Sequence, residues 1–229
     1  MATVPPPKRH PYDQWSPDSR ALDLVGDKWT LLIVRDLAAG PRRFIELQRV
    51  LPGISTEQLR SRLNRMVADG LLTRKRYREV PPRVDYELTE RARDLMPVLG
   101  ALARWGYEWA WSEPRSSEAI DVGAIFRLAP GNLTLDGRTG TVEATVTEGA
   151  NATHYLFTIS EAGTELAETP SERAEARITG ERDAWVGALS PGQDRSGLQI
   201  SGDERLATAL LEGLGGAGVP RAGAATRAA

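Results

Sequence analysis

Residues 40–83 combine a surplus of positive charge with short polar side chains. The segment holds 11 Lys and Arg residues against 4 Asp and Glu residues, a net charge of 11 − 4 = +7, although the 229-residue chain carries −2 overall. Guanidinium groups pair with phosphates, and Ser, Asn and Gln side chains hydrogen-bond the edges of bases. Such a segment attracts polyanions. A solvated charged surface without a partner is the alternative that charge alone leaves open.

One helix is predicted to present the short polar side chains. Ser55 is a suitable N-cap and Gly70 a suitable C-terminal stop. At 100° per residue, one sector between them contains the apolar residues Leu59, Leu63, Met66 and Val67. The other sides carry the residues that we expect to contact nucleic acid, which are Ser55, Thr56, Glu57, Gln58, Arg60, Ser61, Arg62, Asn64 and Arg65. Among these we expect Gln58, Ser61 and Arg65 on base edges and Arg62 on phosphate.

A basic hairpin is predicted after this helix. Strands are expected over 71–77 and 84–88, and their connection contains Pro81 and Pro82, which have no N–H to pair. The tip is therefore expected to project from the body of the domain. Its cations could reach phosphates or a minor groove, and they are Arg74, Lys75, Arg76, Arg78 and Arg83.

Three shorter helices are predicted before these elements. Apolar residues at helical spacing indicate two helices from Pro17, broken near Gly26 and Gly40, and a third over 44–50 that stops at Pro52. Three helices, a basic helix and a basic hairpin are the order of a winged helix-turn-helix, whose recognition helix enters the major groove of duplex DNA. We therefore expect a DNA-binding domain over 12–112.

Residues 16–106 resemble the HxlR family of bacterial transcription regulators. The resemblance is carried by ALDLVGDKWTLLIVRDLAAGPRRFIEL, GISTEQLRSRLNRMVADGLLTR, PPRVDYELTE and LMPVLGALARWG. It implies a homodimer on a pseudo-palindromic operator, with repression expected rather than activation. It also implies a dimer interface through the first and last helices, near Trp15, Leu99, Leu102, Trp105 and Trp109. Many relatives have a cysteine at the position of Ser16, whereas this sequence has no cysteine, which excludes thiol-based sensing.

The last helix of this domain is expected from Thr89 to about Trp111, with a bend near Pro97. Its leucines and tryptophans offer more apolar surface than a small domain covers alone. A partner subunit is the expected cover, and the second domain of the same chain is the alternative.

The second half of the chain is acidic and is predicted to be an α+β domain. Residues 116–229 hold 9 Lys and Arg residues against 16 Asp and Glu residues, a net charge of 9 − 16 = −7. Strands are expected over 122–130, 132–138, 141–149, 153–160, 174–180 and 197–203, and helices over 181–190 and 204–214. The segments 160–168 and 171–176 are expected to be solvated turns. Residues 215–229 are expected to be a disordered tail.

Residues 176–214 resemble the end of sterol-carrier-protein-type lipid-binding domains. The resemblance implies a domain over 118–214 that holds an apolar small molecule between sheet and helices, near Phe126, Tyr155, Phe157, Trp185, Leu189 and Leu210. An ordinary core made of the same residues is the alternative, because layers of sheet and helix need such side chains. In that case the domain is a structural or dimerisation module without a ligand.

Catalysis, metal binding and membrane insertion are not expected. The sequence has neither a GK[ST] phosphate loop nor a GxSxG motif, and the spacing suggests no carboxylate partner for His154. Without cysteine, and with only His10 and His154, the chain offers few ligands for a metal cofactor. No apolar run approaches the ~20 residues that cross a bilayer, and the N-terminus lacks a signal-peptide pattern, so we expect a cytoplasmic protein.

Overall fold

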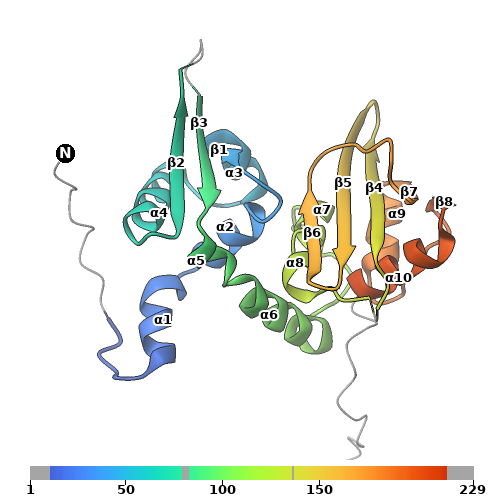
Figure 1. Cartoon of the computed structure of the whole chain (residues 1–229). Helices are drawn as coiled ribbons and strands as arrows, with labels where there is room; N and C mark the ends of the chain where they lie inside the picture. Colours follow the sequence, from blue (N-terminus) through green and yellow to red (C-terminus); the bar gives the residue numbers. More distant parts are fainter. Residues whose placement is uncertain (1–10, 79–82, 136, 216–229) are drawn as a thin grey trace, which may run out of the picture. The chain divides into compact units, whose positions relative to one another are not determined.

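The computed structural model describes residues 11–78, 83–135 and 137–215. It divides into two compact units, Met1–Leu99 and Gly100–Ala229 (Figure 1). The predicted prolines of the hairpin tip and all of the predicted tail except Gly215 lie outside the described residues. Within the described ranges, no helix has the length and apolar character that a bilayer crossing requires.

The first unit contains short helices and a small antiparallel sheet. Its elements are α1 (Pro17–Val25), α2 (Thr30–Asp36), β1 (Arg42–Arg43), α3 (Phe44–Val50), α4 (Thr56–Ala68), β2 (Leu72–Tyr77), β3 (Arg83–Leu88) and α5 (Glu90–Arg93). The sheet order is β1-β3-β2, so the central strand is the second strand of the predicted hairpin. Ile33, Leu47, Leu59 and Leu63 are fully buried and join the helices in one core. The predicted winged helix-turn-helix fold is confirmed.

Local signals define both ends of α4. The Ser55 side chain accepts a hydrogen bond from the Gln58 amide (3.1 Å), while the Gln58 side chain accepts one from the Ser55 amide (3.0 Å), forming a capping box. At the other end Gly70 has a φ of +72°. The amides of Gly70 and Leu71 donate to the carbonyls of Val67 and Met66, which is a Schellman motif.

The single helix predicted from Thr89 to about Trp111 is two helices. α5 ends at Arg93, and α6 covers Met96–Trp109, with Pro97 in its first turn. Pro97 has no N–H that could donate to the carbonyl of Arg93, so a continuous helix would lose a bond at that point. The division between the two units falls within α6, between Leu99 and Gly100. The linker expected at 112–118 stays a prediction.

The second unit is an α+β fold around a mixed sheet of five strands. Besides the rest of α6 it contains α7 (Val122–Phe126), α8 (Ala129–Asn132), β4 (Gly140–Glu148), β5 (Asn151–Ser160), β6 (Gly163–Ala167), β7 (Ala176–Glu181), α9 (Arg182–Leu189), β8 (Gln199–Gly202) and α10 (Glu204–Leu214). The strand order is β6-β5-β4-β7-β8, with β4 and β7 parallel and the other neighbours antiparallel. Both α9 and α10 pack against β4 and β7.

Three predictions for this unit were wrong. The strand expected over 122–130 is the helix pair α7 and α8, and 132–138 contains no strand among its described residues. A short apolar run does not distinguish a buried strand from a buried helical turn, which explains the first error. Gly163–Ala167, expected to lie in a solvated turn, is strand β6, with Thr164 and Leu166 buried.

Candidate nucleic-acid interface

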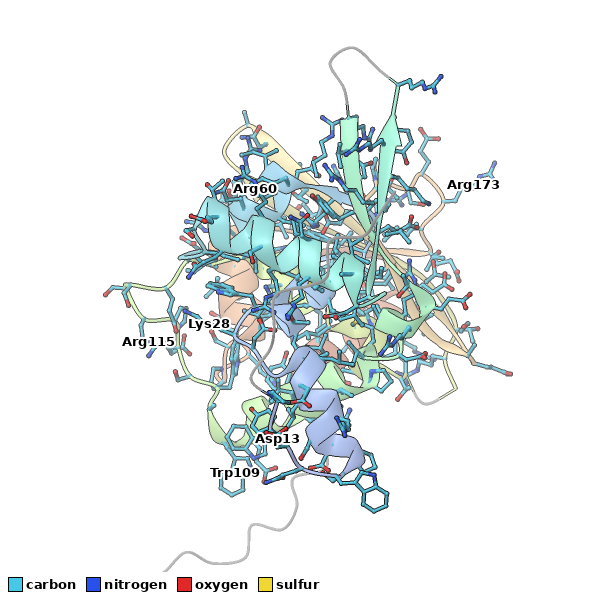
Figure 2. All side chains as sticks on the ribbon, turned by 90° about the vertical axis from the view of Figure 1, so that its left-hand side faces the viewer. Asp13, Lys28, Arg60, Trp109, Arg115 and Arg173 are labelled. Atoms are coloured by element: carbon cyan, nitrogen blue, oxygen red, sulfur yellow. The ribbon has the colours of Figure 1, made fainter. Side chains whose placement is uncertain are left out.

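The outer face of α4 offers side chains without competing contacts. Arg60, Ser61 and Asn64 are exposed, as is Glu57 in the first turn. In the part of the chain that the structure describes, none of these four side chains makes a hydrogen bond or an ion pair. Figure 2 labels Arg60 beside α4. Hydrogen-bonding groups of this kind on an open helix face can contact base edges and phosphates.

The first turn of α4 uses its polar side chains for capping. Ser55 and Gln58 form the capping box, and the Thr56 hydroxyl accepts a hydrogen bond from Gln48 Nε2 at 2.8 Å. Gln58, predicted to contact a base edge, therefore has its side-chain oxygen engaged at the helix start. Its role as a base reader stays a prediction that requires this bond to open.

Two other arginines of α4, Arg62 and Arg65, are engaged within the chain. Arg62 Nη1 lies 2.9 Å from Asp27 Oδ2, and each of these two side chains is 24% exposed. Arg65 is half-buried and has a partner within the protomer. To contact DNA, both side chains would therefore have to give up or share an internal bond. The phosphate contact of Arg62 and the base contact of Arg65 stay predictions.

The hairpin separates its cations onto two faces. Strand alternation places Arg74 and Arg76 on one face, where their cross-strand partners are Tyr86 and Val84. Within the described residues, these two arginines form no ion pair. Lys75 lies on the other face and pairs with Glu87. One face of the hairpin is therefore cationic, and the other is largely neutralised.

Asp85 organises the neutralised face. This carboxylate is 1% exposed and accepts hydrogen bonds from Arg83 Nε, which lies 2.9 Å from each of its oxygens, while Arg43 Nε lies 4.0 Å from Oδ1. The hydrogen bonds from Arg83 lower the pKa of Asp85 despite its burial. The Arg83 guanidinium also lies 5.2 Å from the centre of the Tyr77 ring. Arg43 was not predicted as a site residue, because β1 places it here only by pairing with β3.

The residues predicted at a dimer interface differ in exposure. Trp15 is 96% exposed, Leu102 53%, Trp105 59% and Trp109 58%, whereas Leu99 is only 4% exposed and is covered by its own chain. Another part of the same helix packs inside the second unit, where Tyr107 Oη donates to the Leu214 carbonyl at 2.8 Å. Burial raises the pKa of Tyr107 to about 12, so its hydroxyl stays a donor. Tyr107 is therefore covered by its own chain, and a partner subunit as the cover of the exposed residues stays a prediction.

The residues predicted around an apolar ligand form a packed cluster. Phe126 contacts the rings of Tyr155, Phe157 and Trp185 edge to face, with centroids 4.9, 5.6 and 5.0 Å apart. All three ring contacts lie in the preferred geometry for aromatic pairs. Leu189 and Leu210 are buried as well, at 2% and 0% exposure. This arrangement is that of an ordinary core between sheet and helices.

His154 has a carboxylate partner, contrary to the sequence prediction. Its Nδ1 lies 2.9 Å from Oε1 of the buried Glu143, which also accepts a hydrogen bond from the Ser171 amide at 2.9 Å. The two-residue turn between β4 and β5 sets Thr145 opposite His154, and Glu143 is the diagonal neighbour on the same face. The described residues include no group of three or more His, Asp or Glu side chains that could hold a metal ion.

Together, the open α4, the adjacent cationic hairpin and the three preceding helices define a winged helix-turn-helix domain. Residues 24–114 match the family described as HxlR-like helix-turn-helix. The chain is 41% identical over 97 residues to an uncharacterized HTH-type transcriptional regulator of Synechocystis sp., covering 42% of this chain and 72% of the relative. It is 44% identical over 94 residues to another from Halalkalibacterium halodurans, covering 41% and 83%. The chain belongs to the HxlR-like helix-turn-helix family of transcriptional regulators.

Solved structures of transcriptional regulators are similar to a part of the chain. The redox regulator HypR in its reduced form is 37% identical, with 40% of this chain and 90% of that chain covered and a TM-score of 0.38. The family match ends at residue 114, before the first strand of the second unit.

Proposed function

We propose that this chain regulates transcription by binding duplex DNA as a homodimer. The observation that carries the proposal is the combination of an open α4 face with a hairpin face whose charged side chains, among the described residues, are arginines without an acid partner. Arg60, Ser61 and Asn64 are exposed and make no side-chain bond within the described ranges. An α-helix of this kind fits the major groove, and basic side chains beside it fit the flanking backbone or minor groove.

Roles within the interface follow from which side chains are engaged. Ser61 and Asn64 have the side chains to read base edges, and Arg60, Arg74, Arg76 and Arg78 have those to bind phosphate. Gln58 and Arg65 would join the base readers if DNA replaced their internal bonds. Lys75 and Arg83 already pair with acids, so they contribute less net positive charge.

The dimer is supported by the exposed apolar residues of the predicted interface. Leu102, Trp105 and Trp109 lie at helical spacing on α6, more than half exposed. A twofold dimer would place two α4 helices in successive major grooves, about one turn or a multiple of it apart, and would select a pseudo-palindromic operator. Repression by occupying a promoter is the expected output.

Selection from a pool of randomised duplexes tests this function. We expect the full chain to enrich an inverted repeat and to protect two half-sites on one side of the duplex in footprinting. Enrichment of a single half-site would contradict the dimer. No enrichment over the starting pool, with binding that depends only on salt, would contradict specific DNA recognition.

For the second unit, the packed aromatic cluster favours a structural module over a ligand sensor. An apolar small molecule between sheet and helices would have to separate rings that already contact one another, and packed cores resist such changes. The acidic character of this half would also disfavour nonspecific contact with DNA. Native mass spectrometry of the purified full chain is the test: we expect the bare chain mass or its dimer. A copurifying apolar molecule would instead support the sensor.

A further inference from the structure

We propose that Asp27 is a positioning residue for DNA reading, which holds α4 in its reading orientation through Arg62. This inference rests on the proposed function, because it assigns a role within the same interface. It differs from the sequence prediction, in which Arg62 binds phosphate directly.

Asp27 connects two elements with one carboxylate. It lies in the turn between α1 and α2, where Oδ1 accepts hydrogen bonds from the amides of Trp29 (2.9 Å) and Thr30 (3.1 Å). Its other oxygen, Oδ2, accepts a hydrogen bond from the Thr30 hydroxyl and lies 2.9 Å from Arg62 Nη1. The first turn of α2 and the middle of α4 are therefore joined through a single side chain.

Arg62 lies on α4 at a position where a directional contact can oppose rotation of the helix. Leu59, Leu63 and Met66 are buried, and at 100° per residue Arg62 lies at the edge of that apolar sector. Apolar contacts resist separation of the helix from the core, but they are not directional. A charged, hydrogen-bonded pair at the edge of the sector adds direction, and it fixes which way Ser61 and Asn64 point.

The side chains around Asp27 leave its carboxylate available for the ion pair with Arg62. Lys28, the adjacent cation, lies over the Trp29 ring, 4.6 Å from its centre. Each of the two side chains is about three-quarters buried, so water and salt screen this ion pair less than an exposed pair. Base contacts need side chains held to within about 0.5 Å and 10–20°, so a small rotation of α4 is enough to reduce discrimination between sequences.

Two roles of Arg62 predict different salt dependence. A phosphate contact contributes about 0.9 to the slope of log affinity against log salt concentration, and a dimer would make this contact once from each subunit. An internal positioning pair contributes nothing to that slope. It affects the ratio of operator affinity to scrambled-duplex affinity.

The experiment measures both quantities for the full chain, with the duplex selected by wild type and a scrambled duplex of equal length, over a salt series. We expect Asp27→Asn and Arg62→Gln each to lower the operator-to-scrambled ratio roughly tenfold, the scale of one mismatched base pair. The salt slope on the scrambled duplex is expected to stay at the wild-type value. The double variant is expected to discriminate no worse than either single variant, because the two residues act as one unit.

Matched variants separate positioning from folding and from charge. Asparagine still offers an oxygen to the amides of Trp29 and Thr30, so Asp27→Asn keeps an acceptor for these two hydrogen bonds. Asp23→Asn removes the same charge from the half-buried Asp23 on α1 and is expected to keep the wild-type ratio. Arg60→Gln is expected to flatten the salt slope. Arg62→Lys can still pair with Asp27 and is expected to retain most of the discrimination.

Three results would overturn the proposal. A flatter salt slope for Arg62→Gln would make Arg62 a phosphate contact, and an unchanged ratio for Asp27→Asn would remove its positioning role. An equal fall of the operator-to-scrambled ratio in Asp23→Asn would show that the loss of one negative charge, and not the pairing with Arg62, explains the effect. If wild type itself shows no operator preference, the proposed function fails first, and this result is distinguishable because it appears before any substitution.

Discussion

At the residue scale, the cations of the hairpin are not equivalent. Arg76 lies on the face where, among the described residues, arginines have no acid partner, whereas Arg83 donates to the buried Asp85. We predict that Arg76→Ala weakens binding to operator and to random duplex alike and flattens the salt slope by about 0.9 for each phosphate that is no longer neutralised. Affinity measured on both duplexes over a salt series checks this.

Lys75→Ala is the matched control for Arg76→Ala. Lys75 is the adjacent cation, and it is paired with Glu87. Its removal is expected to change the slope less, since Glu87 already offsets its charge. A larger slope change for Lys75→Ala than for Arg76→Ala would contradict the assignment of the two hairpin faces.

Asp85 links the hairpin to stability in acid. Its pKa lies below the usual value in the folded protein, chiefly because Arg83 donates to it, so the unfolded chain binds a proton more readily. This carboxylate therefore stabilises the fold above the unfolded pKa, and the contribution is lost as pH falls through that value toward the lower folded pKa. Asp85→Asn is predicted to cost about 1–3 kcal/mol at neutral pH and to remove this part of the acid dependence.

Chemical denaturation at neutral and acidic pH tests the Asp85 prediction. Asp69→Asn provides a comparison at a half-buried acid of the same unit. If Asp85→Asn and wild type lose stability in parallel as pH falls, Asp85 is not the group responsible.

Sequence reasoning found the basic residues but not their pairing. Counting charge over 40–83 treats Arg60 and Arg62 alike, yet Arg62 is paired with Asp27 from a different element. The Glu143–His154 contact could have been predicted from the sequence, because a two-residue turn at 149–150 fixes the register of the two flanking strands. The Asp27 contact depends on how separate helices pack, which spacing along the chain does not show.

At the element scale, α4 ends where the backbone turns left-handed. Gly70 has a φ of +72°, and only the Arg91 guanidinium lies near the position that a Cβ would take, at 3.9 Å. A side chain at position 70 would therefore be unfavourable because of backbone strain and not because of crowding. Gly70→Ala is predicted to lower the free energy of unfolding by roughly 1–2 kcal/mol, as expected for an L-residue in this conformation.

Gly70→Asn separates strain from other effects of the substitution, because asparagine tolerates the left-handed region better than alanine. Its destabilisation in thermal or chemical denaturation is expected to be the smaller of the two. Equal destabilisation would show that the added side chain, and not the backbone angle, is responsible.

Elements were predictable where their signals are local. The capping box, the 3.6-residue period and Gly70 define α4 within 16 consecutive residues, Ser55 to Gly70. In contrast, β1 is a strand only because Arg42 and Arg43 pair with Tyr86 and Asp85, more than 40 residues away. The helices α7 and α8 came from an apolar run that fits a strand equally well, and packing decides between the two.

At the scale of the whole molecule, the chain combines a family domain over residues 24–114 with further residues of the second unit, from 115 on, that lie beyond the family match. The net charges of the two halves, +5 (20 − 15) for residues 1–115 and −7 (9 − 16) for 116–229, have opposite signs. Binding to DNA is therefore expected to depend on the first unit, and dimerisation on α6, which contributes residues to both units.

Trp105→Glu tests whether the exposed residues of α6 assemble two copies. Trp105 is 59% exposed, so a charge there should leave the protomer folded but oppose burial in an interface. We predict a monomer in sedimentation velocity and an operator affinity lower by on the order of 100-fold, because two linked half-sites bind far more tightly than one. Ile120→Glu, at a 41% exposed apolar residue of the same unit outside α6, is expected to remain dimeric. A dimer that persists in Trp105→Glu, with unchanged operator affinity, would move the interface away from α6 and would require another surface to set the spacing of the two recognition helices.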